Sequence, residues 1–368
     1  MKNFTIILFI IFSLSNSWAQ NNLCNKLGAW VWVIEATTCK SHKELADSLS
    51  KLGVKRVFMK VADGKNFSNW PELDDKNLVA TYKNKGLEIW AWTYNYPSNE
   101  AAQAEAILRA AKTGYQGFVV DVEMEFDKDS LGLYNLFFAF DKKKKEAIAS
   151  GFATSNFELR VTTWGNPIQH FFNIKAMNPF VSAYMPQTYV EQWGLTYVQN
   201  MEQWMTQGEL DYKKLGATKP IYHIVANEKT INTTGALSAT FLNRFIQKSG
   251  GETSIWRVPG GAISAQNWAN WRGIDWKKDF CSPISTAQLT DFEDINIFPN
   301  PISSNFTIQI NSEKETHVKI SNLNGSLIYE NEFSESVLID SETWISGFYI
   351  CQLTSNGKFK TIKLIKGD

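Results

Sequence analysis

Short apolar runs alternate with stretches of helical periodicity over about the first 280 residues. The runs are rich in Val, Ile, Tyr and Trp, as is typical of buried strands. The clearest predicted helix is 100–113, which follows Ser98 and Asn99 as candidate caps and stops at Gly114. The predicted strands are 29–34, 54–61, 87–94, 117–123, 159–164, 181–189, 220–225 and 254–258. Further helical patterns cover 41–52, 75–85, 134–149 and 266–271.

Eight strands that alternate with helices predict a (β/α)8 TIM barrel, which we assign to residues 20–281. An open doubly wound sheet is the alternative. That fold normally has a Gly-rich phosphate turn after its first strand, whereas residues 35–38 read Glu-Ala-Thr-Thr. The sequence therefore favours the barrel.

The sequence of the first strand predicts which of its side chains face the barrel interior. If Glu35 faces inward at the mouth, then Val33, Val31 and Ala29 line the interior beneath it. The indoles of Trp30 and Trp32 then face the surrounding helices. Small and β-branched residues are expected inside a packed barrel.

The pattern changes near Ser282, where helical periodicity ends. Beyond it the chain has only short alternating runs, and Asn324-Gly325 between two of them is a strong hairpin signal. We expect a linker at 282–296 and a small all-β, immunoglobulin-like sandwich at 297–368.

Four ordered motifs mark this tail: Phe-Pro-Asn-Pro at 298–301, Ile-Ser-Asn-Leu-Asn-Gly at 320–325, Ser-Gly-Phe-Tyr at 346–349, and Lys-Leu-Ile-Lys at 363–366. The tail resembles the C-terminal sorting domain of the type IX secretion pathway. The resemblance implies passage across the outer membrane, with the secretion machinery as a partner. An accessory carbohydrate-binding sandwich is the alternative.

The N-terminus predicts export as well. Lys2 precedes an apolar run at 6–14, and Ser17-Trp18-Ala19 forms a small-x-small cleavage site. We expect a signal peptide at 1–19. No other stretch is long enough to span a bilayer, so we expect a protein that is secreted or held at the cell surface, without a transmembrane segment in the mature chain.

Charge and cysteine content exclude several kinds of partner. Lys plus Arg and Asp plus Glu both number 37, which argues against nucleic-acid binding. There is no CxxC and there are only four His, so the sequence predicts no metal site and no cofactor. Cys24 and Cys281 flank the barrel at its predicted bottom and form the favoured disulfide, whereas Cys39 lies at the top.

Three carboxylates stand at alternate positions at the end of the fourth strand, at Asp121, Glu123 and Glu125. Alternate residues of a strand share a face. Neighbouring carboxylates repel and raise one another's pKa, which suggests that a reaction uses them. A solvated loop is the alternative explanation.

The other strand ends add amide, acidic and aromatic groups, and 14% of the chain is aromatic. Such a rim suits a sugar, since acid catalysis of glycoside cleavage needs paired acidic groups. The candidate substrate-binding residues are Glu35, Tyr94, Glu125, Trp164, Gln187, Tyr189 and Arg257.

The Asp-x-Glu at Asp121 and Glu123 resembles the signature of barrel hydrolases of the lysozyme-like family 25 and the chitinase family 18. The resemblance implies that Glu123 is the general acid and that Asp121 assists, often by orienting an acetamido group. Residues 184–189 and 60–64 resemble further segments of these families. The chain departs from them at strands one and eight, where it has Glu35 and Arg257.

Three functions stay open on this basis. The favoured one is a secreted glycoside hydrolase acting on an N-acetylated glycan. The second is a catalytically inactive barrel that binds glycan at the cell surface. The third is an amidase or esterase that uses the same carboxylates.

Overall fold

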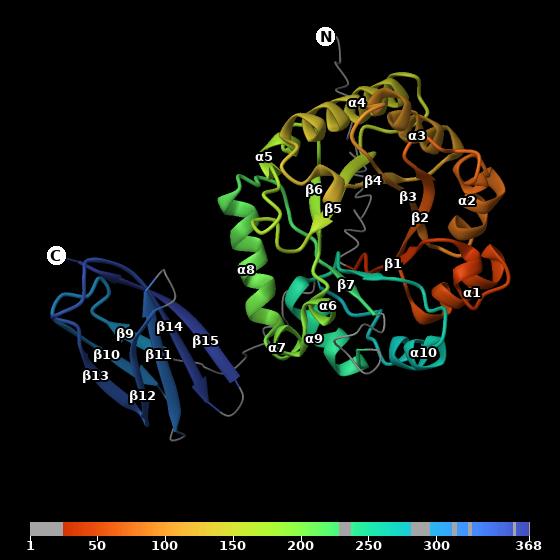
Figure 1. Ribbon diagram of the computed structural model, residues 1–368. Coiled ribbons are helices and arrows are strands. Elements are labelled where there is room, and N and C mark those ends of the chain that lie inside the picture. Colours follow the sequence, from red (N-terminus) through yellow and green to blue (C-terminus); the bar gives the residue numbers. More distant parts are fainter. Residues whose placement is uncertain are drawn as a thin grey trace, which may run out of the picture. The chain divides into compact units, whose positions relative to one another are not determined.

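The computed structural model describes residues 25–227, 237–280, 295–310, 315–322, 326–355 and 358–367 (Figure 1). They belong to two compact units, divided between residues 281 and 282. The predicted signal peptide, the Cys24–Cys281 disulfide and nearly all of the predicted linker lie outside the described residues. None of the helices in the described ranges is both long and apolar enough to cross a membrane.

The first unit is a closed barrel of eight parallel strands in chain order, with helices outside it (Figure 1). The predicted (β/α)8 barrel is confirmed. Its strands are β1 (Gly28–Val31), β2 (Arg56–Asp63), β3 (Glu88–Tyr94), β4 (Gly117–Asp121), β5 (Glu158–Trp164), β6 (Ala183–Gln187), β7 (Ile224–Ala226) and β8 (Ser254–Trp256).

Local signals explain where several helices begin and end. The Ser41 hydroxyl caps the first turn by accepting from the Glu44 amide, and Gly53 ends the same helix with a left-handed φ of 99°. The helices are α1 (His42–Leu52), α2 (Lys76–Lys83), α3 (Glu100–Thr113), α4 (Ser130–Ala149), α5 (Ile174–Met177), α6 (Val190–Trp193), α7 (Leu195–Gln199), α8 (Met201–Lys214), α9 (Ala239–Ser249) and α10 (Ser264–Arg272). Three 3-10 helices are η1 (Ile34–Ala36), η2 (Pro71–Leu73) and η3 (Met124–Phe126).

Large aromatic side chains fill the middle of the barrel. Trp30 stacks on Phe58 with ring centroids 4.5 Å apart and meets Trp92 edge-on at 5.5 Å. The Trp30 indole N–H donates to the Ser254 hydroxyl across the β1–β8 seam. Residues of six strands join this interior cluster, which comprises Trp30, Phe58, Trp90, Trp92, Val119, Met185 and Ile224.

The predicted orientation of the first strand is therefore wrong. Trp30 faces inward, while Ala29 and Val31 belong to the core between strands and helices. Trp32 follows the end of β1 and is 41% exposed. Both faces of a barrel strand are buried, so hydrophobicity does not distinguish the inner face from the outer one.

Two arginines close the lower end of the barrel. The guanidinium groups of Arg56 and Arg160 lie 4.2 and 4.7 Å from the centre of the Trp90 ring. Both bond to Glu252, at 3.1 and 2.7 Å. Each side chain is at most 2% exposed, so the paired carboxylate and the ring replace the water that these charges lose.

The second unit consists of antiparallel strands in two sheets, ordered β13-β10-β9 and β12-β11-β14-β15. Alternate residues of both sheets, such as Phe306 and Cys351, share one core. This arrangement confirms the predicted small all-β sandwich. The strands are β9 (Ile295–Phe298), β10 (Asn305–Ile310), β11 (Thr316–Asn322), β12 (Leu327–Phe333), β13 (Ser336–Asp340), β14 (Gly347–Ser355) and β15 (Lys358–Lys366).

Gly117 provides a test of the aromatic interior. A Cβ atom at this position would lie only 2.5 Å from the Trp90 ring, so Gly117→Ala forces the indole to move. We expect a loss of about 1–3 kcal/mol of stability, as for other overpacked cores. Chemical denaturation followed by intrinsic fluorescence measures it. The loss should shrink when Trp90→Phe is added, and additive effects of the two changes would contradict the contact.

Candidate active site

Asp121 and Glu123 lie together at the barrel mouth. The side chain of Gln187, the last residue of β6, joins them. The Gln187 amide nitrogen donates to Asp121 Oδ1 at 3.1 Å and to Glu123 Oε1 at 2.8 Å. Both carboxylates therefore bond to the same nitrogen atom, which keeps them close to each other. β4 itself ends at Asp121, so this bridge, rather than a continuing strand, keeps Glu123 beside its partner.

Burial dominates the electrostatics of this pair. Asp121 is 6% exposed, and desolvation raises the pKa of its carboxyl well above the ordinary value, with Glu123 as the next cause. Desolvation also raises the pKa of Glu123; Glu125 adds to the rise, while the Gln187 hydrogen bond and Lys60 oppose it. A carboxyl with a raised pKa retains its proton at higher pH, as a general acid requires.

A second network surrounds the pair from the ends of β2 and β3. The Tyr94 hydroxyl donates to Glu125 Oε2 at 2.7 Å, and the Tyr96 hydroxyl donates to Asp63 Oδ1 at 2.7 Å. Lys60 Nζ donates to the other Asp63 oxygen at 2.6 Å. Burial, followed by the bond to Asp63, raises the pKa of Tyr96 to about 12. Burial, followed by the bond to Glu125, also raises the pKa of Tyr94 well above its ordinary value. Both tyrosines therefore remain protonated donors at neutral pH.

Lys60 supplies positive charge within this acidic mouth. Its side chain is 5% exposed, and Nζ lies 4.6 Å from the Trp70 ring centre and 5.2 Å from that of Trp92. The aromatic faces and Asp63 stabilise the buried ammonium. Lys60 lowers the pKa values of both Asp121 and Glu123, and so partly offsets their mutual repulsion.

The other predicted site residues occupy different surroundings. Tyr189 packs against the interior aromatic cluster. The Trp164 indole donates to Asp127 at 3.0 Å and stacks on His170 at 3.8 Å. The Arg257 guanidinium lies 4.8 Å from the Trp32 ring centre.

The inward placement of Glu35 is wrong. β1 ends at Val31, and Glu35 lies in η1 with its side chain exposed. Lys60, Asp63 and Tyr96 were not among the substrate-binding residues chosen from the sequence, although they belong to the strand ends of the same rim. Their position at the ends of predicted strands two and three was the available signal, because the strand ends of a barrel meet at one face.

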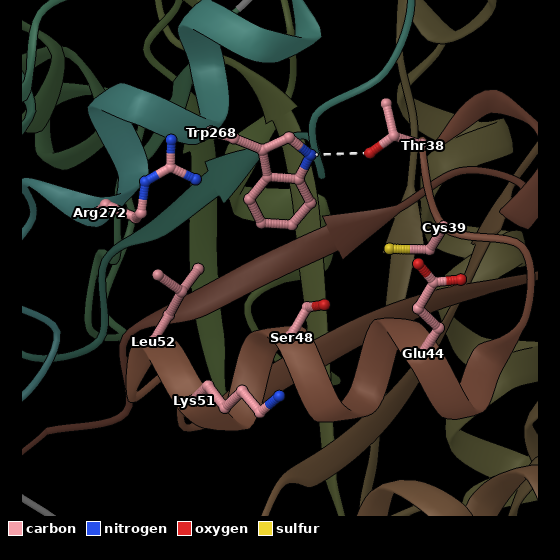
Figure 2. A pocket seen from close by; sticks show the side chains of 8 residues that line it. All are labelled: Thr38, Cys39, Glu44, Ser48, Lys51, Leu52, Trp268 and Arg272. Carbon is pink, nitrogen blue, oxygen red and sulfur yellow. Dashed lines mark hydrogen bonds between the residues drawn. The ribbon is translucent and has the colours of Figure 1, made fainter.

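A separate cavity of about 490 Å³ lies in the helix layer between α1 and α10 (Figure 2). The Trp268 indole N–H donates to Thr38 Oγ1 at 2.8 Å on one side, and the Cys39 sulfur points into the space. Burial, then the charge of Glu44, raises the pKa of the Cys39 thiol. The thiol is therefore protonated and a poor nucleophile at neutral pH.

Among the residues that the structure describes, no group of three or more His, Cys, Asp or Glu side chains is placed to hold an ion.

One comparison with known proteins concerns the tail of the chain. Residues 296–367 match the family model of the secretion system C-terminal sorting domain. That domain belongs to the type IX pathway and implies export to the cell surface or secretion. No curated protein matches the chain.

Solved structures share the fold. An endo-β-1,4-mannanase from Thermotoga petrophila aligns with a TM-score of 0.51 and 11% identity, over 94% of this chain and 98% of that one. A class V chitinase from Nicotiana tobaccum aligns with a TM-score of 0.46 and 13% identity, over 68% and 97% of the two chains. At 11% identity the likeness to the mannanase shows the fold alone.

The buried carboxyl of Asp121 makes stability depend on pH. Its raised folded-state pKa means that the native protein binds more protons than the unfolded chain between the two pKa values, so stability falls as pH rises through that window. Asp121→Asn removes this penalty and still accepts from Gln187. We expect a higher melting temperature of the barrel at pH 7, by about 2–4 °C for each kcal/mol relieved.

Thermal denaturation between pH 3 and pH 8 measures this effect. The two melting temperatures should converge below about pH 4, where an unfolded aspartate also protonates. Asp275→Asn, which changes an exposed carboxylate, is the matched control. A lower melting temperature of Asp121→Asn at pH 7 would contradict the assignment.

Lys60 gives a test that needs no substrate. Lys60→Met removes the cation that lowers both carboxyl pKa values, so the titrations of Asp121 and Glu123 should move to higher pH. Carboxyl carbon-13 NMR measures the two midpoints directly. Lys43→Met, an exposed lysine of α1, should leave them unchanged. Unmoved midpoints in Lys60→Met would show that its charge does not reach the pair.

Proposed function

We propose that this protein is an exported glycoside hydrolase that cleaves an N-acetylated glycan at the barrel mouth. Glu123 is the general acid and Asp121 is the assisting carboxylate. The sorting domain carries the protein to the secretion machinery and the cell exterior. The observation that carries the proposal is the single Gln187 amide shared by Asp121 and Glu123.

The proton that this chemistry requires on Glu123 agrees with the surroundings of that side chain. Glycoside cleavage begins when an acid protonates the leaving oxygen, and burial helps Glu123 keep that proton. As the bond to the leaving oxygen breaks, the substrate's acetamido oxygen attacks the anomeric carbon. Asp121 holds the acetamido N–H during this step. Water, deprotonated by Glu123, then attacks the same carbon and restores the acetamido group.

The proposed route predicts retention of configuration. The separation of two carboxyl groups distinguishes retaining from inverting enzymes only where one carboxylate is the nucleophile, and here the nucleophile is the substrate's acetamido oxygen. Both substitutions at the anomeric carbon in the proposed route invert it, so the product keeps the substrate's configuration.

The aromatic side chains at the mouth suit a sugar substrate. Tyr94 and Tyr96 meet edge-on with centroids 5.3 Å apart, and Tyr96 is 39% exposed. Aromatic faces pack against the apolar faces of sugar rings, while nearby carboxylates and amides bind hydroxyls. The mannanase with a similar barrel acts on a glycan, in agreement with this class of substrate.

A catalytically inactive glycan-binding barrel is the second candidate. The observation that favours it is the absence of a carboxylate from two expected places: Glu35 is exposed in η1, and β8 is followed by Arg257. Binding requires the same aromatic and amide groups but no acid. The two candidates differ only in whether Glu123 transfers a proton.

Glu123→Gln separates them. Removal of a general acid typically lowers the rate about 10²–10⁴-fold, and the neutral amide preserves size and hydrogen bonding. We therefore expect release of reducing ends from chitin or peptidoglycan to fall by that factor while glycan binding persists. Glu146→Gln, an exposed carboxylate of α4, is the matched control.

Wild-type protein that binds these glycans but releases no reducing ends would refute the hydrolase. That result would support the second candidate, the catalytically inactive glycan-binding barrel.

A further inference from the structure

A polar cavity of about 270 Å³ lies where β7 and β8 end. The chain after both strands faces the mouth side of the barrel, where barrel proteins bind their ligands. The cavity is lined by Asn227, Arg257, Val258, Pro259, Gly260, Gly261, Ala262, Ile263 and Asn267. None of these residues except Arg257 belonged to the site predicted from the sequence.

Asn227 is the unusual member of this lining. It is 1% exposed, and neither its side-chain oxygen nor its nitrogen has a hydrogen-bond partner among the described residues. Its backbone is fixed: the amide donates to the Trp256 carbonyl at 2.7 Å, and its carbonyl accepts from Asn267 Nδ2 at 2.8 Å. The structure therefore holds the residue firmly while the side-chain amide stays unpaired.

Asn267 adds a second open acceptor. Its side chain is 4% exposed and donates to Asn227, which leaves Oδ1 without a partner in the described ranges. A buried polar group without a partner costs about 1–3 kcal/mol. An apolar side chain of similar size would avoid this cost, so the two amides need an explanation outside the stability of the fold.

The open groups define the chemistry of a ligand. Asn227 offers an NH2 group with two N–H donors and one acceptor oxygen, and Asn267 offers another acceptor oxygen. A phosphate or carboxylate only accepts hydrogen bonds and would face both open oxygens with its negative charge. A sugar hydroxyl or an acetamido group both donates and accepts. Val258, Pro259 and Ile263 of the lining add apolar contacts.

We propose that this cavity is a subsite for one neutral sugar unit of the glycan, held through its hydroxyl or acetamido groups by Asn227 and Asn267. Its volume is below the about 300–1,000 Å³ typical of sites for larger ligands, which suits a single unit. The inference rests on the proposed function, because it names a further contact for the same glycan.

NMR of the full chain tests the subsite directly. The probe is the tetramer of N-acetylglucosamine, added to Glu123→Gln protein labelled with nitrogen-15 at asparagine side chains, so that no turnover occurs. We expect the Asn227 side-chain amide signals, identified by their loss in Asn227→Ala, to shift on addition. Affinity should fall about tenfold in Asn227→Ala and stay unchanged in Asn135→Ala, an exposed position of α4.

The melting temperature of ligand-free Asn227→Ala distinguishes a binding role from a structural one. Because the amide has no protein partner to lose, the variant should melt at or above the wild-type temperature. A clear decrease would overturn the proposal by showing that Asn227 supports the fold. Through-bond assignment from the Asn227 backbone, in protein labelled with carbon-13 and nitrogen-15, identifies the same signals without this variant, so the shift test does not depend on its folding.

The remaining outcomes separate this proposal from the catalytic one. If the tetramer binds without moving the Asn227 signals, the subsite is refuted while the hydrolase stands. If inorganic phosphate moves them and the tetramer does not, the cavity binds an anion and the subsite is refuted. If the tetramer moves them but wild-type protein releases no reducing ends, the subsite stands and the hydrolase fails.

Discussion

The packing of aromatic rings inside the barrel is the constraint on which the rest of the first unit depends. Four large rings, those of Trp30, Phe58, Trp90 and Trp92, occupy the interior. They leave no room for a Cβ atom at Gly117 beside Trp90. The buried guanidinium groups and the Lys60 ammonium lie over the faces of these rings in cation–π contacts. Polar chemistry is thereby restricted to the two ends of the barrel.

Buried charges are balanced at the lower end of the barrel and unbalanced at its mouth. At the lower end, arginines and glutamates pair, and the Arg160 and Arg56 charges lower the pKa of Glu252 despite its burial. At the mouth, carboxylates outnumber the one lysine that offsets them, and the pKa of Asp121 rises. Balanced charge of the first kind stabilises a structure, whereas unbalanced charge of the second kind is typical of sites that transfer protons.

The sorting domain and the barrel give the protein two separable tasks. The sandwich has its own core, built from alternate residues of two antiparallel sheets. Its match to the secretion family concerns export. The carboxylate pair and the amide-lined cavity belong to the barrel. The function proposed above connects both tasks through a glycan substrate.

The sequence by itself determined the order of elements, many helix ends and the tail. Gly114 and the Ser41 cap act within a few residues, and the tail strands expose one face, so their alternation is visible. The tertiary structure alone decided which face of β1 is inside, that Glu35 lies exposed in η1, and that Gln187 joins Asp121 to Glu123. Barrel strands are buried on both faces, so their sequence carries no record of which side is the interior. Contacts between strands distant in the chain settle that question.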